Sequence, residues 1–598
     1  MTTVNAAHGA EDVRWDLTRL YRDPDGEALG DLGAAEQMAQ GLSSRLHGKI
    51  GDLDAAGLSA AVDELQAIQE KVEKAGTFAF LNFATDTGDP ARGAFLQRVQ
   101  EHATAVATTI LFFELEWAAV PDGRADELLA DPALERWRHF LKAVRRFRPH
   151  LLTEPEEKIV AEKAVTGRSA WVRLFTQVTD AITVDLDGEQ ATLEQALALL
   201  HSPDRDVRQR AGRATTEALQ PGLPVRTYIL NSILTDHALD DRLRHYSSWI
   251  AARNLGNEIS DATVQALVDA VTSRYDIPAR WYRLKARLLG IDELNEHDRY
   301  APLSPDEAEV EWAEARTTVL DAYRSFSPEM ADIATEFFDG YIDAPPEPGK
   351  QGGAFAHPAV PSAHPYVMLN YTGQRRDVMT LAHELGHGVH QVLANKQGLF
   401  NASTPLTLAE TASIFGETVT FGRILSEETD AKARLALIGG RIEDIAASIF
   451  RQVAMNRFED AVHNARREEG ELSPDVISEH WIRTQRAMFG DSLTITDEYA
   501  SWWSYIPHFI HTPGYVYAYA FGNLLALAVY ARYEKEGSSF VPSYLQLLSA
   551  GGSDTPDELG RLVGVDLTDP NFWSAGLQVV DELVSEAETL AAAQTGSP

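Results

Sequence analysis

The spacing of hydrophobic and polar residues follows a helical period along most of the chain. Apolar residues recur three and four positions apart in long amphipathic runs, which predict helices over residues 55–75, 91–117 and 193–219. Alternation with a period of two, which is typical of strands, is rare. The pattern therefore predicts a mainly helical protein.

The clearest strand pattern lies between residues 181 and 192. Apolar and polar residues alternate there before Asp187-Gly188, a dipeptide typical of two-residue hairpin turns. The sequence that begins at Thr192 matches a helix start with a capping box. At 598 residues the chain exceeds the size of a single core. We expect the hairpin to separate two helical regions, an N-terminal lobe over residues 1–200 and a larger domain over 201–598.

The middle of the chain combines a loop, a strand and a helix. Prolines and glycines cluster over residues 344–365, which predicts a long irregular loop, and such loops are often functional. Residues 366–371 then match a short strand, and Asp377 begins a helical pattern that runs to Leu393.

One stretch, residues 513–531, has no charged residue and is about long enough to cross a bilayer. It contains Asn523, and its tyrosines are spread along its length, whereas aromatic residues of a membrane span gather at the two ends. We therefore expect a buried helix in this stretch.

The predicted helix from Asp377 contains the sequence Leu-Ala-His-Glu-Leu-Gly-His-Gly-Val-His at residues 381–390. His383 and His387 are four residues apart, so both imidazoles project from one helix face and can share one metal ion. Glu384 lies beside them, where it can act on metal-bound water without being a ligand. The spacing also arises by chance, but the apolar helix, the upstream strand and the acidic residues downstream favour a zinc site.

Zinc in a hydrolytic site needs a third protein ligand and an open fourth position. His390 lies seven residues after His383, a rise of about 10.5 Å along the helix, which is too far for both to bind one ion. Residues 407–418 predict a second helix that carries Glu410 and Glu417 on one face. Either carboxylate can be the ligand or can orient a ligand histidine through its free N–H. Spacing alone leaves the two roles open.

Composition narrows the chemistry and the partners. Cysteine is absent, so a metal must be held by His, Asp or Glu, and the absence fits a reducing compartment. The formal net charge of -36 repels phosphate backbones and anionic membranes, so we expect neither nucleic acid nor a membrane as partner. The N-terminus has no basic segment followed by an apolar core, and we expect a cytoplasmic location.

Taken together, these residues resemble the oligoendopeptidase F branch of the thimet-oligopeptidase-like zinc metallopeptidases. The resemblance covers nearly the whole chain. Besides the helix with both histidines, it rests on Trp15-Asp-Leu, Asp187-Gly188 with the helix that follows, and residues 349–355, 365–371, 409–413, 506–509 and 515–519.

The resemblance implies a saddle-like, two-lobed helical zincin with a small β-sheet beside the HExxH helix. It places one zinc ion per chain at the floor of a deep central channel, which admits short unfolded peptides and excludes folded proteins. It also assigns Glu410 as the third ligand, which leaves Glu417 for the supporting role. A monomer or a homodimer is expected.

The same resemblance identifies residues that act on the substrate. His508, Tyr515 and Tyr519 match the family's donors to the transition state, and Tyr519 is the first choice for the oxyanion. Strand 366–371 is expected to pair with an extended peptide. The residues expected to contact that peptide are Gly352, Gly353, Tyr366 and Tyr517.

The sequence therefore predicts a zinc-dependent endopeptidase that hydrolyses internal bonds of short oligopeptides, with Glu384 as general base. One alternative is an exopeptidase that uses the same zinc triad. Another is a zinc-stabilised peptide-binding protein without catalysis. The presence of Glu384 argues against the second alternative, because a structural zinc site has no use for this carboxylate and closes its fourth position.

Overall fold

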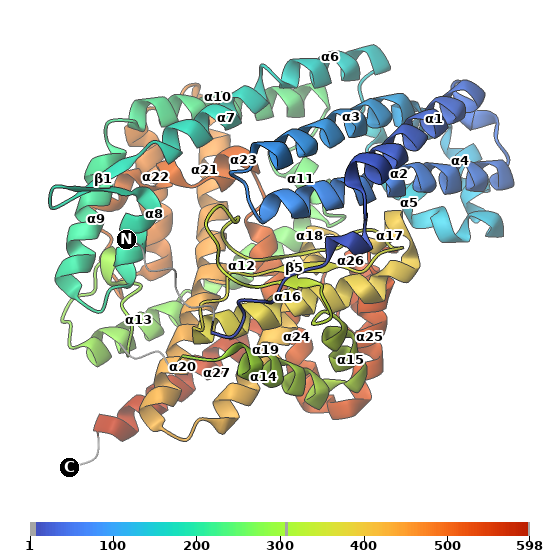
Figure 1. The fold of residues 1–598 in the computed structure, drawn as a ribbon. Coiled ribbons are helices and arrows are strands. Elements are labelled where there is room, and N and C mark those ends of the chain that lie inside the picture. Colours follow the sequence, from blue (N-terminus) through green and yellow to red (C-terminus); the bar gives the residue numbers. More distant parts are fainter. Residues whose placement is uncertain (1–7, 305–308, 596–598) are drawn as a thin grey trace. The chain divides into compact units, whose positions relative to one another are not determined.

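The computed structural model describes residues 8–304 and 309–595. Helices account for 73% of the structure, and the strands form two small sheets (Figure 1). The prediction of a mainly helical fold with a small sheet is confirmed.

The chain packs into two compact units, each assembled from three separate stretches of sequence. The described residues of unit 1 fall within Met1–Leu151, Glu307–Ile424 and Arg532–Val565, and those of unit 2 within Leu152–Asp306, Leu425–Ala531 and Asp566–Pro598. This division differs from the single boundary predicted near residue 200. Local sequence patterns carry no information about which distant segments pack together, so they could not reveal it.

Unit 1 contains the N-terminal helices and the helix with the two histidines. Its helices are α1 (Leu29–Leu46), α2 (Ala55–Ala84), α3 (Pro90–Ala119), α4 (Asp122–Ala130), α5 (Arg138–Arg146), α14 (Trp312–Phe326), α15 (Pro328–Glu336), α16 (Arg375–Ala394), α17 (Leu399–Ala402), α18 (Leu406–Ala409), α25 (Val541–Ala550) and α26 (Pro556–Leu562). Helices α1, α2 and α3 lie side by side (Figure 1), and Trp117 and Trp137 are almost fully buried in the core that they share.

Unit 2 is also helical. Its helices are α6 (Glu154–Ala164), α7 (Arg168–Asp180), α8 (Leu193–Ala198), α9 (Arg205–Leu219), α10 (Leu223–Leu243), α11 (Ala251–Gly256), α12 (Asp261–Ser273), α13 (Asp276–Leu289), α20 (Ala431–Ile445), α21 (Arg451–Glu469), α22 (Pro474–Phe489), α23 (His508–His511) and α27 (Pro570–Thr595). Two boundaries between the units fall within helices, namely α19 (Thr411–Glu427) and α24 (Tyr517–Glu536).

Local sequence explains where several helices begin. The side chain of Asp54 accepts a hydrogen bond from the N–H of Gly57 and caps α2, and Asp89 caps α3 in the same way, with Pro90 at the first helical position. The run predicted as one helix over residues 193–219 is instead two helices, α8 and α9. Pro203 lies between them, and a proline cannot supply the N–H that a continuous helix requires.

The predicted hairpin is confirmed in unit 2. Strands β1 (Thr183–Leu186) and β2 (Glu189–Thr192) pair in antiparallel fashion, and Asp187 and Gly188 connect them with positive φ angles of 57° and 93°. Both angles are those of a type I′ turn. Thr192 then caps α8 through a capping box with Gln195, as its sequence predicts.

The sheet beside α16 has three strands, β3 (Ile342–Asp343), β4 (Phe355–His357) and β5 (Tyr366–Met368), in the order β3-β5-β4. Strand β5 is parallel to β3 and antiparallel to β4. It therefore has neighbours on both sides and offers no free edge to a peptide, which corrects the prediction that strand 366–371 receives the substrate. The edge belongs to β4, which lies inside the segment predicted as an irregular loop.

Backbone and side-chain contacts fix the loop that precedes β4. The N–H of Thr87 donates to the carbonyl of Gly349 at 2.7 Å, and Gln351 donates to Ala84 at 2.8 Å, so the loop is held against the end of α2. The buried ammonium of Lys350 contacts a carboxylate oxygen of Asp343 at 2.6 Å. These contacts restrict the conformation of the glycine-rich loop.

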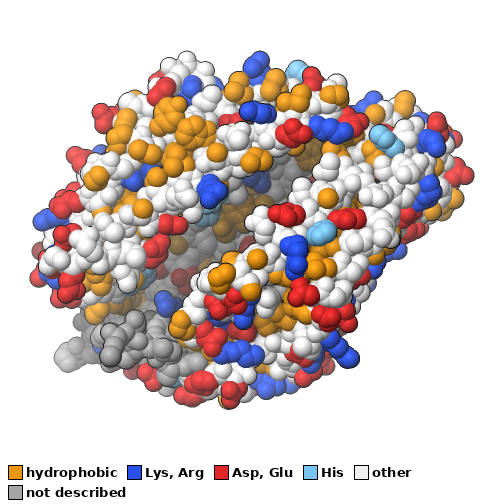
Figure 2. Space-filling model, turned by 45° about the horizontal axis from the view of Figure 1, so that its top comes forward, with side chains coloured by type: hydrophobic (Ala, Val, Ile, Leu, Met, Phe, Trp, Pro, Cys, Tyr) orange, Lys and Arg blue, Asp and Glu red, His pale blue; other side chains and the backbone are white. Residues whose placement is uncertain are grey.

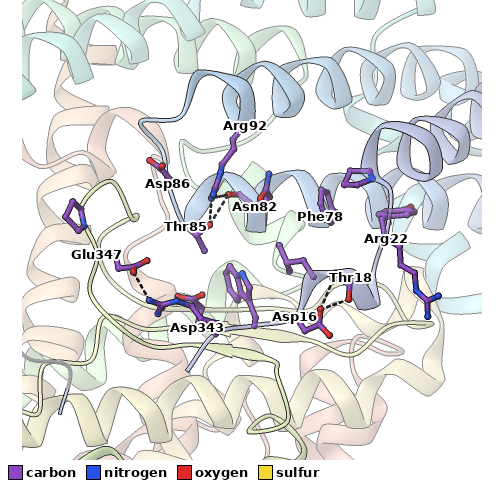
Figure 3. Close-up of a pocket in the computed structure, with 16 residues that line it drawn as sticks. Asp16, Thr18, Arg22, Phe78, Asn82, Thr85, Asp86, Arg92, Asp343 and Glu347 are labelled. Atoms are coloured by element: carbon purple, nitrogen blue, oxygen red, sulfur yellow. Dashed lines mark hydrogen bonds and ion pairs between the residues drawn. The ribbon is translucent and has the colours of Figure 1, made fainter. Parts of the chain in front are cut away.

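An open cavity of about 820 Å³ lies in unit 1 between this loop, the N-terminal segment and α2. Figure 3 shows charged side chains at its rim, including Arg92 and Glu347, with Phe78 on its α2 wall. Arg14 spans part of the cavity and pairs with Glu347 at 2.6 Å. Neither of the two histidines nor any of the downstream glutamates lines this cavity, so it is separate from the predicted metal site.

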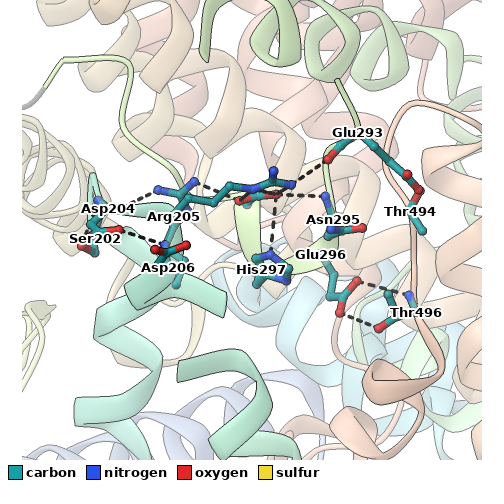
Figure 4. Close-up of polar contacts among 12 residues, drawn as sticks. Ser202, Asp204, Arg205, Asp206, Glu293, Asn295, Glu296, His297, Thr494 and Thr496 are labelled. Carbon is teal, nitrogen blue, oxygen red and sulfur yellow. Dashed lines mark hydrogen bonds and ion pairs between the residues drawn. The ribbon is translucent and has the colours of Figure 1, made fainter. Parts of the chain in front are cut away.

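A buried polar network in unit 2 contacts Thr496, which lies in the segment before residues 506–519. The Asp298 side chain is completely buried and accepts hydrogen bonds from Arg208 at 2.9 Å and from Arg205 at 2.9–3.2 Å. Nearby, Glu296 accepts from the hydroxyl of Thr496 at 2.7 Å (Figure 4). Because the buried carboxylate is paired with two arginines, its charge is compensated.

Acidic and basic side chains are interspersed on the face drawn in Figure 2. Within the described residues, no single helix is long and apolar enough to span a membrane, although one sharply bent pair, α3 with α4, passes a test of length and composition. The stretch tested as a span, residues 513–531, contributes most of the buried helix α24, as predicted.

Candidate metal centre

The helix with both histidines begins close to the start that its sequence predicts. The Asp377 carboxylate accepts hydrogen bonds from the backbone N–H groups of Thr372 at 2.7 Å and Gln374 at 3.1 Å, which satisfies groups at the start of α16. Helix α16 begins at Arg375, two residues before the predicted start. His383 and His387 then face the same side, with ring centres 4.8 Å apart.

Three potential ligand atoms converge in unit 1. The Nε2 atoms of His383 and His387 are 3.2 Å apart, and the Oε2 atom of Glu410 lies 3.3 Å from the first and 3.4 Å from the second. His390 is not part of this group, in agreement with the spacing argument. Burial lowers the pKa of His390 to about 4, so its imidazole is neutral at physiological pH.

The size of this triangle fits a zinc ion. For metal–ligand bonds of about 2.0–2.1 Å in tetrahedral geometry, neighbouring ligand atoms lie about 3.3–3.4 Å apart. The observed separations of 3.2–3.4 Å match this value. The donor set of two imidazoles and one carboxylate supplies three ligands, and the fourth position of a tetrahedral site is left for water or substrate.

Glu417 supports one of the histidines from α19. Its Oε1 atom lies 2.5 Å from Nδ1 of His383, so Nδ1 carries the proton and donates to the carboxylate. The lone pair of Nε2 is then directed at the position of the metal. This contact fits the supporting role that the resemblance gave to Glu417.

Charges within the cluster favour a bound cation. Burial lowers the pKa of His383, but hydrogen bonds and the charges of Glu410 and Glu417 outweigh it and raise this pKa well above its usual range. Burial raises the pKa of Glu410, but the two imidazoles lower it far below the usual range. The Glu410 carboxylate therefore stays ionised beside the imidazoles and attracts positive charge, which a divalent metal supplies.

Glu384 is placed differently from the ligands. Its side chain is buried, with 6% of its surface exposed, and burial raises the pKa of its carboxyl group. Among the described residues, no hydrogen-bond donor pairs with this carboxylate. A carboxylate with a raised pKa and no protein partner is suited to exchange protons with water.

Close contact between two backbones brings Glu410 to the histidines. A Cβ atom on Gly386 would lie 2.6 Å from the carbonyl oxygen of Ala412 and 2.6 Å from Cα of Ser413, so only glycine allows α16 and α19 to pack this closely. The hydroxyl of Ser413 donates to Oε2 of Glu410 at 2.8 Å and orients it. Sequence reasoning did not assign a role to Ser413, although its spacing of three residues from Glu410 within a helical segment was a usable signal.

The contact with Glu417 predicts a measurable effect on metal affinity. We expect Glu417→Ala to weaken zinc binding about 10–100-fold, because the imidazole of His383 loses its orienting acceptor. Glu417→Gln keeps an acceptor without the charge and should fall between wild type and Glu417→Ala. Titration against a chelator measures the affinity, with the exposed Glu427→Ala on the same helix as control. Unchanged affinity in Glu417→Ala would contradict the role of this carboxylate.

The residues predicted to act on the transition state lie in unit 2. Nε2 of His508 is 3.3 Å from the hydroxyl of Tyr519, and the rings of Tyr515 and Tyr519 are 5.0 Å apart. Burial, followed by the charge of Arg451, lowers the pKa of His508, so its imidazole is neutral at physiological pH. Tyr515 and Tyr519 are both partly exposed, and the contact between their rings places them side by side.

Two residues predicted to contact substrate are buried instead. Tyr517 has 0% of its surface exposed, and its hydroxyl accepts a hydrogen bond from Asn257 at 2.8 Å. Tyr366 is 1% exposed and its hydroxyl donates to the carbonyl of Asp16 at 3.3 Å. Both are packing residues, because neither presents a surface to a peptide. Gly352 and Gly353, by contrast, are exposed, and one residue, Ala354, separates them from β4.

Comparison with known proteins identifies the family. The model of peptidase family M3 matches residues 198–579, which is more than half of the chain. The chain belongs to peptidase family M3. The oligopeptidase F model matches residues 116–183.

Relatives of this M3 peptidase align with it over nearly their full length. Oligopeptidase PepF of Bacillus subtilis (strain 168) is 27% identical over 97% of this chain and 87% of its own. Group B oligopeptidase PepB of Streptococcus agalactiae is 25% identical over 98% of both chains. The crystal structure of oligoendopeptidase-F from Enterococcus faecium shares the fold, with a TM-score of 0.72 and 23% identity over 95% of this chain and 98% of that one. The prediction of a metalloendopeptidase is therefore confirmed at the level of the family.

Proposed function

We propose that this M3 peptidase is a zinc-dependent oligoendopeptidase in which His383, His387 and Glu410 bind one zinc ion. The observation that carries the proposal is the triangle of ligand atoms with sides of 3.2–3.4 Å, beside a glutamate that has no hydrogen-bond partner among the described residues. The names of the relatives, which include oligopeptidases and oligoendopeptidases, support short peptides as substrates.

Glu384 is the general base of the proposed reaction. A zinc ion in this site supplies Lewis acidity that polarises the peptide carbonyl and lowers the pKa of water toward neutrality. The Glu384 carboxylate accepts a proton from the attacking water and returns it to the leaving amine. Its burial keeps the carboxylate poorly solvated and its pKa raised, which makes it a stronger base than an exposed glutamate.

His508 and Tyr519 are proposed as donors to the oxyanion that forms on the former carbonyl oxygen. The Tyr519 hydroxyl is a neutral donor, and its contact with His508 at 3.3 Å restricts its orientation. Donors that are fixed before the reaction stabilise the transition state more than the ground state. Tyr515 packs against Tyr519 and is proposed to contribute to the same surface.

Replacement of the Tyr519 hydroxyl tests this role. We expect Tyr519→Phe to lower kcat about 100–1,000-fold with little change in KM, because the lost hydrogen bond forms only in the transition state. Steady-state kinetics on a quenched peptide measure both constants. Tyr517→Phe is the matched control, since it removes a buried hydroxyl that contacts Asn257, and its kcat should stay near that of wild type. A Tyr519→Phe protein with wild-type kcat would exclude Tyr519 as an oxyanion donor.

The peptide is proposed to bind as an additional strand along the free edge of β4. Edge strands accept extended peptides through backbone hydrogen bonds, and the exposed Gly352 and Gly353 allow close approach at the start of this edge. Binding of this kind depends on the peptide backbone more than on its side chains.

Product mapping tests the mode of cleavage. Mass spectrometry of one short peptide after limited digestion should reveal internal cuts. Ladders that shorten by one residue from either end would instead identify an exopeptidase on the same metal site. Binding without products would identify a peptide-binding protein, and would refute the assigned reaction.

A further inference from the structure

The free edge of β4 carries one pair of outward backbone groups. The N–H of Val367 donates to Tyr341 at 2.9 Å on the β3 side, so its register partner Ala356 points both its N–H and its carbonyl away from β5. Among the residues that the structure describes, the N–H of Ala356 has no acceptor. The N–H of Ala356 is therefore the group on β4 with which an added strand would pair.

A side chain from the metal-binding helix contacts this position. Nε2 of Gln391 donates to the outward carbonyl of Ala356 at 3.3 Å. The identity of the donor is unambiguous, because a carbonyl oxygen only accepts hydrogen bonds. Gln391 lies four residues after His387 and eight after His383, so all three project from the same face of α16.

Among the described residues, the side-chain amide of Gln391 makes no other hydrogen bond. Its Oε1 atom is buried and has no hydrogen-bond partner among the described residues. An unpaired buried oxygen is unfavourable, and an apolar side chain of similar length would avoid it. The contact that distinguishes glutamine from such a side chain is the bond to Ala356.

We infer that Gln391 is a positioning residue that fixes the substrate-binding edge of β4 relative to the metal ligands on α16. The inference rests on the proposed function, because it concerns where a peptide pairs with β4. Strand β4 is three residues long and is paired with another strand, β5, on one side only. The hydrogen bond from Gln391 on α16 to the outward carbonyl of Ala356 therefore restricts movement of the edge of β4 along the helix.

The position of this edge determines which peptide bond meets the metal. Successive residues of a strand are about 3.3 Å apart, so a small shift of β4 brings a neighbouring bond into range. Misplacement of about 1 Å also costs on the order of 100-fold in rate. Gln391 thus contributes to accurate selection of the cleaved bond, apart from any effect on metal binding or folding.

Two variants remove the donor while preserving length. Gln391→Glu has the same shape but no N–H donor, and Gln391→Met is apolar. For both we expect intact zinc content. Gln391→Met should keep a melting temperature near that of wild type, whereas the unpaired carboxylate of Gln391→Glu should lower it. We also expect kcat/KM to fall about 10–100-fold, and cleavage of a single-site peptide to spread to adjacent bonds. Mass spectrometry of early products measures this distribution.

Gln397→Glu is the matched control. Gln397 also donates from its side-chain amide to a backbone carbonyl in unit 1, that of Ser549 at 2.8 Å, but it does not contact β4. Its cleavage pattern should match that of wild type.

Gln391 variants with unchanged rates and cut sites, or variants that lose zinc, would overturn the inference. Neither result would affect the proposed function. That function is tested separately, by cleavage of peptides by the wild-type protein and by the loss of this cleavage in Glu384→Gln.

Discussion

A Glu384→Gln protein is expected to bind zinc and fold normally while its kcat falls about 100–10,000-fold, the range contributed by a general base. The substitution preserves the shape of the side chain but removes its capacity to accept a proton at neutral pH. The three proposed ligands, His383, His387 and Glu410, are untouched, so the ligand triangle should persist. Zinc content by atomic emission and turnover of a quenched peptide measure the two properties on the same sample.

The control is Glu314→Gln, which alters an exposed glutamate of α14 in the same unit. It removes the same charge at the surface and should leave kcat unchanged. If Glu384→Gln retained wild-type turnover at full zinc occupancy, another residue would have to be the base. If it lost zinc together with activity, Glu384 would instead belong to the metal-binding set.

The sequence predicted the part of the site that lies on one helix. The helical period and Asp377 placed the start of α16 within two residues, and a separation of four residues placed His383 and His387 on one face. These features are local, because helix geometry alone relates residues one turn apart. Strand β4 was missed because three residues, Phe355-Ala-His357, are too few to display an alternating pattern.

Contacts between distant segments required the structure. The sequence left Glu410 and Glu417 interchangeable, and only the family resemblance assigned Glu410 as the ligand before the folded chain placed Oε2 of Glu410 near both imidazoles. Tyr517 was expected to contact substrate, yet it is fully buried, because tyrosines two residues apart cannot share a helix face. The break at Pro203 was available from sequence, since proline disfavours a helix interior.

The close contact at Gly386 gives the second large effect. We expect Gly386→Ala to abolish zinc binding at micromolar metal and to destabilise unit 1. The added Cβ would lie 2.6 Å from backbone atoms of Ala412 and Ser413, and these atoms cannot rotate away as a side chain could. Relief of the contact requires α16 and α19 to separate by about 1 Å, whereas zinc sites tolerate deviations of about 0.2 Å in ligand distance.

Gly388→Ala is the matched control for this effect. Gly388 lies two residues further along α16, and a Cβ there would meet the ring of Phe337 and not the segment that carries Glu410. Overpacking of this kind costs about 1–3 kcal/mol, so Gly388→Ala should lower the melting temperature and keep its zinc affinity once folded. Chelator titration and thermal unfolding separate the two outcomes. Equal zinc affinity in both variants would mean that the two helices can separate without moving Glu410, and that the closeness of their backbones does not determine the geometry of the metal site.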